Sequence, residues 1–139
     1  MTWATPQAMF LRFVIPDRHP KSGVRKGIFG AAYELRRGGD LTEGERQELD
    51  RLIDWFDDNL PRPSRFNRSK SKGYYHRAAK GISWLKSTAE EHLENMRALI
   101  GILEDQGHQV TMIKTLRPGY VVYEDDFQIV AEPFNDTTT

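Results

Sequence analysis

The stretch that decides the fold class is QVTMIKTLRPGYVVYEDDFQIVAE, residues 109–132. It holds three short runs rich in β-branched and aromatic residues, which is the composition of strands, at residues 109–116, 120–123 and 127–132. Residues 117–120, RPGY, carry proline and glycine at the two central positions of a type II turn, and residues 124–126 supply a second turn. Because both connections are tight, the sequence predicts that these strands form an antiparallel meander.

Two helices are predicted well upstream of this stretch. Residues 28–37 place Ile28, Ala32 and Leu35 on one face, and a pair of glycines follows as a stop. Residues 42–59 open with a capping box made by Thr42 and Glu45 and continue with an apolar stripe at helical spacing.

A third helix is predicted to begin between residues 82 and 87 and to end near residue 106. Ser87 and Glu90 are candidates for its capping box, and Gly107 suits the position just beyond its end. His92 lies on this helix, and we expect it at the surface or half-buried.

A first strand is predicted at residues 10–15, FLRFVI, followed by a loop at residues 17–27. The expected order is therefore β-α-α-α-β-β-β, an α+β two-layer sandwich with a mainly antiparallel four-stranded sheet and the helices on one face. We expect residues 1–139 to form a single domain, with a basic loop or helix start at 59–86 and a frayed tail at 135–139.

Composition bounds the function classes. The chain of 139 residues is 38% hydrophobic and 29% charged, which is typical of a globular domain. It has no cysteine, so disulfides, thiolate zinc sites and cysteine nucleophiles are excluded. No apolar run approaches the roughly 20 residues of a membrane span, and no signal peptide is recognisable, so the expectation is a cytoplasmic protein without a membrane partner.

Charge is segregated along a chain whose formal net charge is zero. Residues 1–39 carry a net charge of +5, residues 40–58 of −6, residues 59–86 of +8 and residues 87–139 of −7. The basic and acidic blocks could neutralise one another within the fold, or the +8 block could face an anionic ligand.

The +8 block is the strongest candidate for a binding site, because aromatic residues are interleaved with its cations. Lysine and arginine attract phosphates, and exposed tyrosines stack on unpaired bases. The candidate polyanion-binding residues are Arg62, Arg65, Arg68, Lys70, Lys72, Tyr74, Tyr75, Arg77, Lys80 and Lys86. A second basic group, Arg18, Lys21, Arg25 and Lys26, extends this face. The leading hypothesis is a non-enzymatic binding module for DNA, RNA or another phosphate-rich ligand.

Two alternatives come from other classes of protein. A protein–protein adaptor or inhibitor would use the charge blocks for electrostatic complementarity to a protein partner. A small metal-dependent hydrolase or nuclease would use the carboxylates of Glu124, Asp125, Asp126 and Glu132, since Mg²⁺ prefers oxygen ligands. The sequence contains no His-Glu-x-x-His, no phosphate-binding glycine loop and no dinucleotide fingerprint, so we assign no catalytic residue, metal ligand or cofactor.

Several runs resemble a set of short bacterial proteins that are described only as hypothetical. These runs are GISWLK at residues 81–86, EHL and MR at residues 91–97, PGYVVYED at residues 118–125 and AEPF at residues 131–134. The resemblance implies a bacterial, cytosolic, single-domain protein, and it transfers no catalytic or binding residue.

Overall fold

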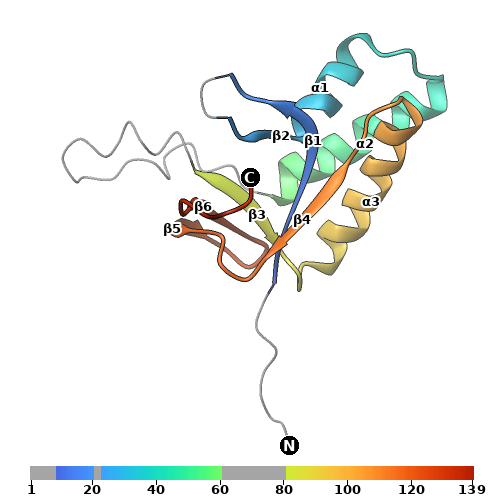
Figure 1. Cartoon of the computed structure of the whole chain (residues 1–139). Helices are drawn as coiled ribbons and strands as arrows, with labels where there is room; N and C mark the ends of the chain where they lie inside the picture. The colour runs from blue at the N-terminus through green and yellow to red at the C-terminus, as the bar shows by residue number, and fades with distance from the viewer. Residues whose placement is uncertain (1–8, 21–22, 61–80) are drawn as a thin grey trace, which may run out of the picture.

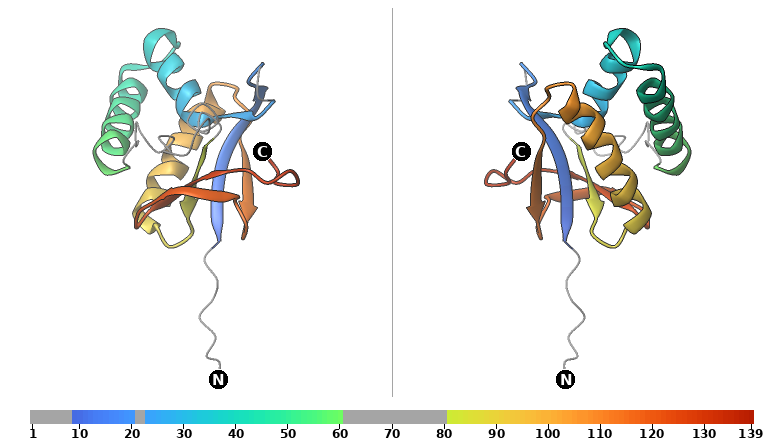
Figure 2. Two further views of the ribbon diagram at one scale, coloured as in Figure 1. Left: turned by 90° about the vertical axis from the view of Figure 1, so that its left-hand side faces the viewer. Right: turned by 90° about the vertical axis from the view of Figure 1, so that its right-hand side faces the viewer.

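The structure is a computed structural model, which describes residues 9–20, 23–60 and 81–139. The elements in these ranges are β1 Phe10–Arg18, β2 Arg25–Gly27, α1 Ile28–Gly38, α2 Glu43–Asn59, β3 Ile82–Lys86, α3 Glu90–Asp105, β4 Thr111–Thr115, β5 Tyr120–Glu124 and β6 Gln128–Glu132. The α+β class is confirmed, and the helices pack against the sheet, as Figures 1 and 2 show. The prediction of four strands was wrong, because the described residues form a sheet of six.

Strand β1 is the centre of the sheet. One of its edges pairs with β4 along five residues, from Phe10–Thr115 to Val14–Thr111. The opposite edge pairs with β3 at its start and with β2 further along. Strand β6 then joins β3 to β5, and every pairing is antiparallel. The predicted meander was therefore wrong: β5 and β6 form a hairpin, but β4 pairs with β1 instead of β5.

The largest local error concerns residues 82–86, which were predicted to begin a helix and instead form β3. Ile82 and Trp84 are buried on one face of the sheet, and Ser83 between them is exposed, which is the alternation of a strand. Leu85 faces the helices instead. Helix α3 begins only at Glu90, after a short turn. The last five residues of the +8 block, 82–86, therefore form a strand and not a loop or the start of a helix.

Other boundaries also differ from the predictions. Strand β1 runs past Pro16 to Arg18, and the predicted loop at 17–27 contains β2. The second capping box was wrong, because the N-cap of α3 is Ala89. Ser87 pairs instead with Met9: the Met9 N–H donates to Ser87 Oγ (3.2 Å) and the Ser87 N–H donates to the Met9 carbonyl (2.8 Å).

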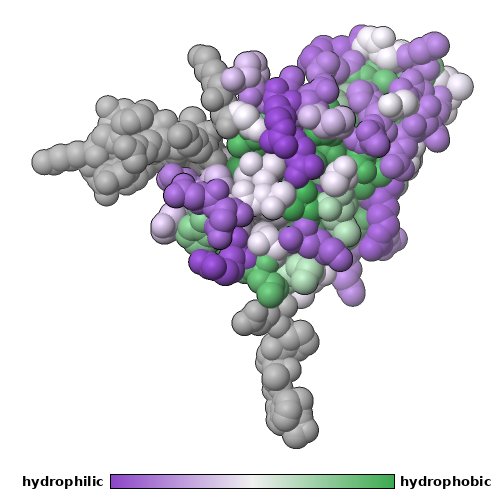
Figure 3. Space-filling model, in the orientation of Figure 1, coloured by the Kyte–Doolittle hydropathy of each residue, from purple (hydrophilic) through white to green (hydrophobic). Residues whose placement is uncertain are grey.

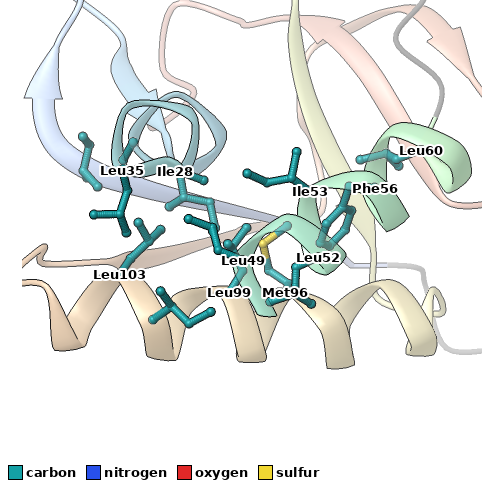
Figure 4. Packing of buried hydrophobic residues seen from close by; sticks show 14 of the residues in the cluster. Ile28, Leu35, Leu49, Leu52, Ile53, Phe56, Leu60, Met96, Leu99 and Leu103 are labelled. Carbon is teal, nitrogen blue, oxygen red and sulfur yellow. The ribbon is translucent and has the colours of Figure 1, made fainter. Parts of the chain in front are cut away.

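The core has two parts, one on each face of the sheet. The larger part lies between the sheet and the three helices and includes Ile28, Leu52, Phe56, Leu99 and Leu103 (Figure 4). The predicted amphipathic stripes of α1 and α2 supply most of it, and both helices are confirmed within one residue. The smaller part lies on the other face. Its members are Val14, Ile82, Trp84, Ile113 and Ile129.

The capping box of α2 is also confirmed. The Thr42 hydroxyl accepts a hydrogen bond from the Glu45 N–H (3.2 Å), and the Glu45 carboxylate accepts one from the Thr42 N–H (2.9 Å). Arg46 follows in the same turn and donates to the carbonyls of Arg36 and Gly39. The start of α2 therefore also holds the end of α1.

The turn between β4 and β5 depends on Gly119, whose φ is +140°. A Cβ at this position would lie 2.7 Å from the carbonyl carbon of Glu132 and 2.9 Å from Cα of Pro133. Glycine is required here for both conformation and space, because the turn lies directly on the end of β6.

The tail is more ordered than the frayed end that was predicted. The Phe134 N–H donates to Thr137 Oγ1 (2.9 Å), and the Thr137 N–H donates to the Phe134 carbonyl (3.1 Å). The Thr139 carbonyl accepts hydrogen bonds from the Arg25 N–H (3.0 Å) and from Arg12 Nη1 (2.9 Å). These contacts fasten the last residues to β1 and β2.

Candidate functional site

A cleft of about 300 Å³ opens where strands β1 and β3 diverge. The two strands pair only at Phe10–Lys86 and Leu11–Leu85. The edge of β1 is next paired at Val14, with Gly27 of β2, and the cleft lies in the gap between β2 and β3. A volume of this order accommodates one small ligand, as does a hollow of about 310 Å³ beside β4, so the candidate rests on the lining of the cleft rather than on its size.

The described lining of the cleft combines an apolar wall with a few polar groups and contains no aspartate or glutamate. The apolar wall comes from β1, α1, α2, β3 and α3, and its residues are Leu11, Phe13, Ile28, Leu60, Leu85 and Met96. Arg12, His19 and Ser83 are the polar residues of the lining. Gly27 and Phe29 complete one side, where α1 begins. The electrostatic character of this lining is therefore neutral to positive.

Arg12 is the most unusual residue of the cleft, because it is a charged side chain with only 9% of its surface exposed. Its guanidinium donates to the carbonyl oxygens of Thr139 and Arg25. Burial lowers the pKa of Arg12, repulsion from Arg25 lowers it further, and the pKa falls to about 10. Arg12 is consequently charged at neutral pH, in a position that disfavours charge.

The predicted polyanion-binding residues between Arg62 and Lys80 lie outside the described residues. Leu60 precedes them and Gly81 follows them, and both of these flanking residues line the cleft. Of the second basic group, Lys21 also lies outside the described residues, whereas Arg18, Arg25 and Lys26 adjoin residues of β1, β2 and their connection that line the cleft.

Lys86 is the one candidate residue of the +8 block that the structure describes. Its Nζ lies 2.5 Å from the Glu124 carboxylate, and its side chain is only 17% exposed. This ion pair joins β3 to the end of β5. Because its charge is already paired, Lys86 is not part of the site that we propose below.

Two of the four carboxylates proposed for a metal are engaged in other contacts. Glu124 pairs with Lys86. The Asp125 carboxylate accepts hydrogen bonds from the backbone N–H groups of Phe127 and Gln128, the Gln128 amide and the Tyr123 hydroxyl. Burial raises the pKa of Asp125, but these hydrogen bonds lower it by more, so the pKa lies below its ordinary value of 3.8. Asp125 thus closes the β5–β6 turn, and no group of three possible metal ligands exists among the described residues.

His92 is buried, which contradicts the expectation of a surface or half-buried position. Its ring stacks on Phe127 with centroids 4.3 Å apart and meets Trp55 edge-on at 4.7 Å. Its Nε2 lies 2.7 Å from the Asn59 carbonyl oxygen, at the end of α2. The histidine therefore joins α2, α3 and the β5–β6 turn, and it fixes the residue that precedes Leu60 at the cleft.

Acidic residues gather on the outer faces of the helices, which point away from the sheet. In Figure 3 the visible surface of the helical layer is largely hydrophilic. The exposed acids of this layer are Glu34, Glu43, Asp54, Asp57, Asp58, Glu90, Glu91, Glu94, Glu104 and Asp105. The helical layer thus carries many exposed carboxylates together with the exposed cations Arg37, Arg51 and Arg97, whereas the described lining of the cleft carries no carboxylate.

Comparison of the chain with protein-family models, with curated proteins and with solved structures gives no match. Within the ranges that the structure covers, no helix combines the length and apolar character needed to cross a membrane.

Sequence reasoning missed Arg12 as a functional candidate, although a signal was present. It is the only charged residue in the run FLRFVI, residues 10–15, and it interrupts a strand whose neighbours are all apolar. In a strand with both faces covered, such a residue is buried and needs a partner.

Proposed function

We propose that this chain is a small non-enzymatic binding module that takes a phosphate-bearing ligand, foremost DNA or RNA, at the end of the molecule where the cleft opens. One observation carries the proposal. The described lining of the cleft holds a buried arginine and no aspartate or glutamate, and both ends of a segment with seven cations, residues 61–80, start from its rim.

The arrangement of charge favours an anionic polymer over a neutral ligand. Each lysine or arginine that contacts a phosphate releases a condensed counterion, so affinity accumulates with the number of cations. Arg18, Arg25 and Lys26 adjoin, in β1 and β2, residues that line the same cleft, and their charges would add to the attraction for a polyanion.

Fluorescence anisotropy tests the proposal, with labelled single-stranded DNA, duplex DNA and RNA titrated at about 50 and 200 mM salt. We expect binding that weakens steeply with salt. Replacing Arg65, Arg68, Lys70 and Lys72 by alanine should lower the slope of log K against log salt by about 3, because each lost phosphate contact removes about 0.7–0.9.

The matched control replaces Arg37, Arg51, Arg97 and Lys114, which are exposed and do not line the cleft, and so removes the same total charge. Its salt slope should stay close to that of the unaltered chain. Failure to bind any of the three nucleic acids at about 50 mM salt, where electrostatic contacts are strongest, would contradict the proposal. An equal loss in both quadruple variants would show only a general charge effect.

A protein partner is the second candidate, and one observation favours it. The edge strands β4 and β5 and the turn that follows β4 expose large apolar side chains: Met112, Leu116, Tyr120 and Val121. Edge strands with apolar residues are a common surface for protein recognition. A stable complex recovered on this chain that survives nuclease treatment, and that Met112→Lys and Val121→Lys abolish, would favour this reading over the first.

A further inference from the structure

Strand β4 forms one outer edge of the sheet, beside β1 (Figure 2). Among the described residues it pairs only with β1, along five consecutive positions without an irregularity. Strand β5 forms the other outer edge, but its pairing with β6 shifts register between Val121 and Tyr123. Irregularities of this kind hinder the addition of a further strand, so β4 is the edge that is open to pairing.

The alternation of the ladder shows which main-chain groups β4 presents at this edge. The Ser87 N–H donates to the Met9 carbonyl, so the main chain of Met9 faces β3. Successive residues of an antiparallel strand direct their main-chain groups to alternate edges, so the main chain of Arg12 faces β4, where its partner is Ile113. The main chain of Ile113 therefore faces β1, and its two neighbours in β4 face outwards. These outward-facing residues are Met112 and Lys114.

The sequence of β4 suits antiparallel pairing with a second copy of itself about a two-fold axis at Ile113. In this register Thr111 lies opposite Thr115 of the second copy, and such threonine pairs are favoured across strands. Met112 lies opposite Lys114 of the second copy, and each such pair exchanges two main-chain hydrogen bonds. All five residues of the strand are then paired.

Charge and length select this register over its neighbours. An axis at Lys114 would place the Lys114 side chains of the two copies directly opposite each other, and like charges in that position destabilise a strand pair. An axis at Met112 would place Thr115 opposite Gln109, which lies outside β4. With the axis at Ile113, the aliphatic stem of each lysine packs along a methionine and its charged end reaches water.

Apolar surface lies along the same edge. Met112 exposes 47% of its surface, and Leu116, which follows the strand directly, exposes 50%. Continued by one residue, the register places Leu116 opposite Val110 of the second copy, so the pairing would cover apolar side chains at both ends of the strand. A single strand pair buries less than the ~1,200 Å² of a standard interface, so we expect an affinity in the micromolar range.

We propose that this chain forms a two-fold symmetric dimer in solution by antiparallel pairing of β4 with β4 of a second copy, with the axis at Ile113. Such a dimer needs no nucleic acid and does not use the cleft, so the inference is independent of the proposed function. The pairing would join two six-stranded sheets into one continuous sheet. It would also bring two clefts into one particle, so that a long polyanion would gain affinity by contacting both.

Sedimentation velocity at about 5 to 500 µM measures the self-association, and the charge at position 112 tests the register. Met112→Lys brings a lysine opposite Lys114 of the second copy, twice in each dimer, and should weaken the dimer about tenfold. Met112→Glu brings a carboxylate to the same position and should tighten the dimer, with a smaller gain in 1 M salt. Combining Met112→Lys with Lys114→Glu should restore the affinity of the parent.

The matched controls are Val121→Lys and Val121→Glu, which make the same changes at an exposed residue of the other edge strand, β5. Neither should change the affinity of the dimer. A parent that remains a monomer at about 500 µM overturns the inference. A dimer that Met112→Lys and Met112→Glu weaken equally, or that the Val121 variants weaken instead, also overturns it.

Cysteine cross-linking checks the register directly, because the chain has no cysteine of its own. Thr111 and Thr115 of the second copy would form a non-hydrogen-bonded pair with Cα atoms about 4.5 Å apart, which is within the range of a disulfide. A mixture of the Thr111→Cys and Thr115→Cys proteins should therefore form a cross-linked dimer under mild oxidation much faster than either protein alone. Equal rates in the mixture and in the separate proteins would overturn the inference.

Discussion

The same substitution, glycine to alanine, should have opposite effects at Gly119 and Gly101. At Gly119 the backbone φ of +140° costs a non-glycine residue about 1–3 kcal/mol. The new Cβ would also overlap the backbone of Glu132 and Pro133, which cannot rotate away as a side chain can, and overpacking costs a further 1–3 kcal/mol or so. The expected loss in the free energy of unfolding is therefore about 4 kcal/mol.

Gly101 provides the matched control. It lies in α3, is exposed, and has no atom within 4 Å of the position that a Cβ would occupy. Alanine is favoured over glycine in a helix interior by about 1 kcal/mol, so Gly101→Ala should stabilise the protein and raise the Tm by about 3–5 °C. The two variants should therefore change the free energy of unfolding in opposite directions, although the chemical change is identical.

Urea denaturation followed by far-UV circular dichroism measures both effects on one scale, with the midpoint and the m-value fitted separately. The m-values should remain equal if each variant changes only the stability of the folded state. A Gly119→Ala variant that unfolds within about 1 kcal/mol of the parent would refute the reasoning, because the turn would then not lie against the end of β6.

Three further predictions concern local interactions. Thr42→Ala should cost about 1 kcal/mol, and adding Glu45→Ala should cost less than the sum of the single changes, since both side chains serve one cap; urea denaturation checks this. The Asp125 carboxylate stabilises the fold fully above the pKa that Asp125 has in the unfolded chain. This stabilisation is lost as the pH falls through the lower pKa that Asp125 has in the folded protein. Asp125→Asn should therefore flatten the pH dependence of unfolding below about pH 4. A double-mutant cycle on Lys86 and Glu124 should give a coupling of about 0.5–1 kcal/mol that shrinks in 1 M salt, and a coupling independent of salt would contradict an ion pair.

The sequence was informative where structure is set locally. The helices α1 and α2 were predicted correctly because an apolar stripe, a capping box and flanking glycines or prolines all indicate the same boundaries. The run ISWLK at residues 82–86 was misassigned because five largely apolar residues fit a helix start and a buried strand equally well. Its identity as a strand is fixed by β1 and β6, which lie far away in the sequence.

The pairing of β1 with β4, and not of β4 with β5, also depends on contacts that no local pattern encodes. The same holds for the candidate site. Its lining comes from β1, the β1–β2 connection, α1, the end of α2, β3 and α3, so only the folded chain brings these residues together. The sequence indicated a basic region but could not show that Leu60 and Gly81, which flank residues 61–80, line one cleft.

The central position of β1 has a consequence for the order in which this protein can fold during synthesis. Residues 10–14 leave the ribosome early, yet their partners in β4, residues 111–115, follow about a hundred residues later. At roughly 5–20 residues per second, β1 waits about 5–20 s for the strand that completes its longest pairing. Until then the helices can form, but one edge of an apolar strand stays open, and the pairing that closes it has a long sequence separation, which slows folding.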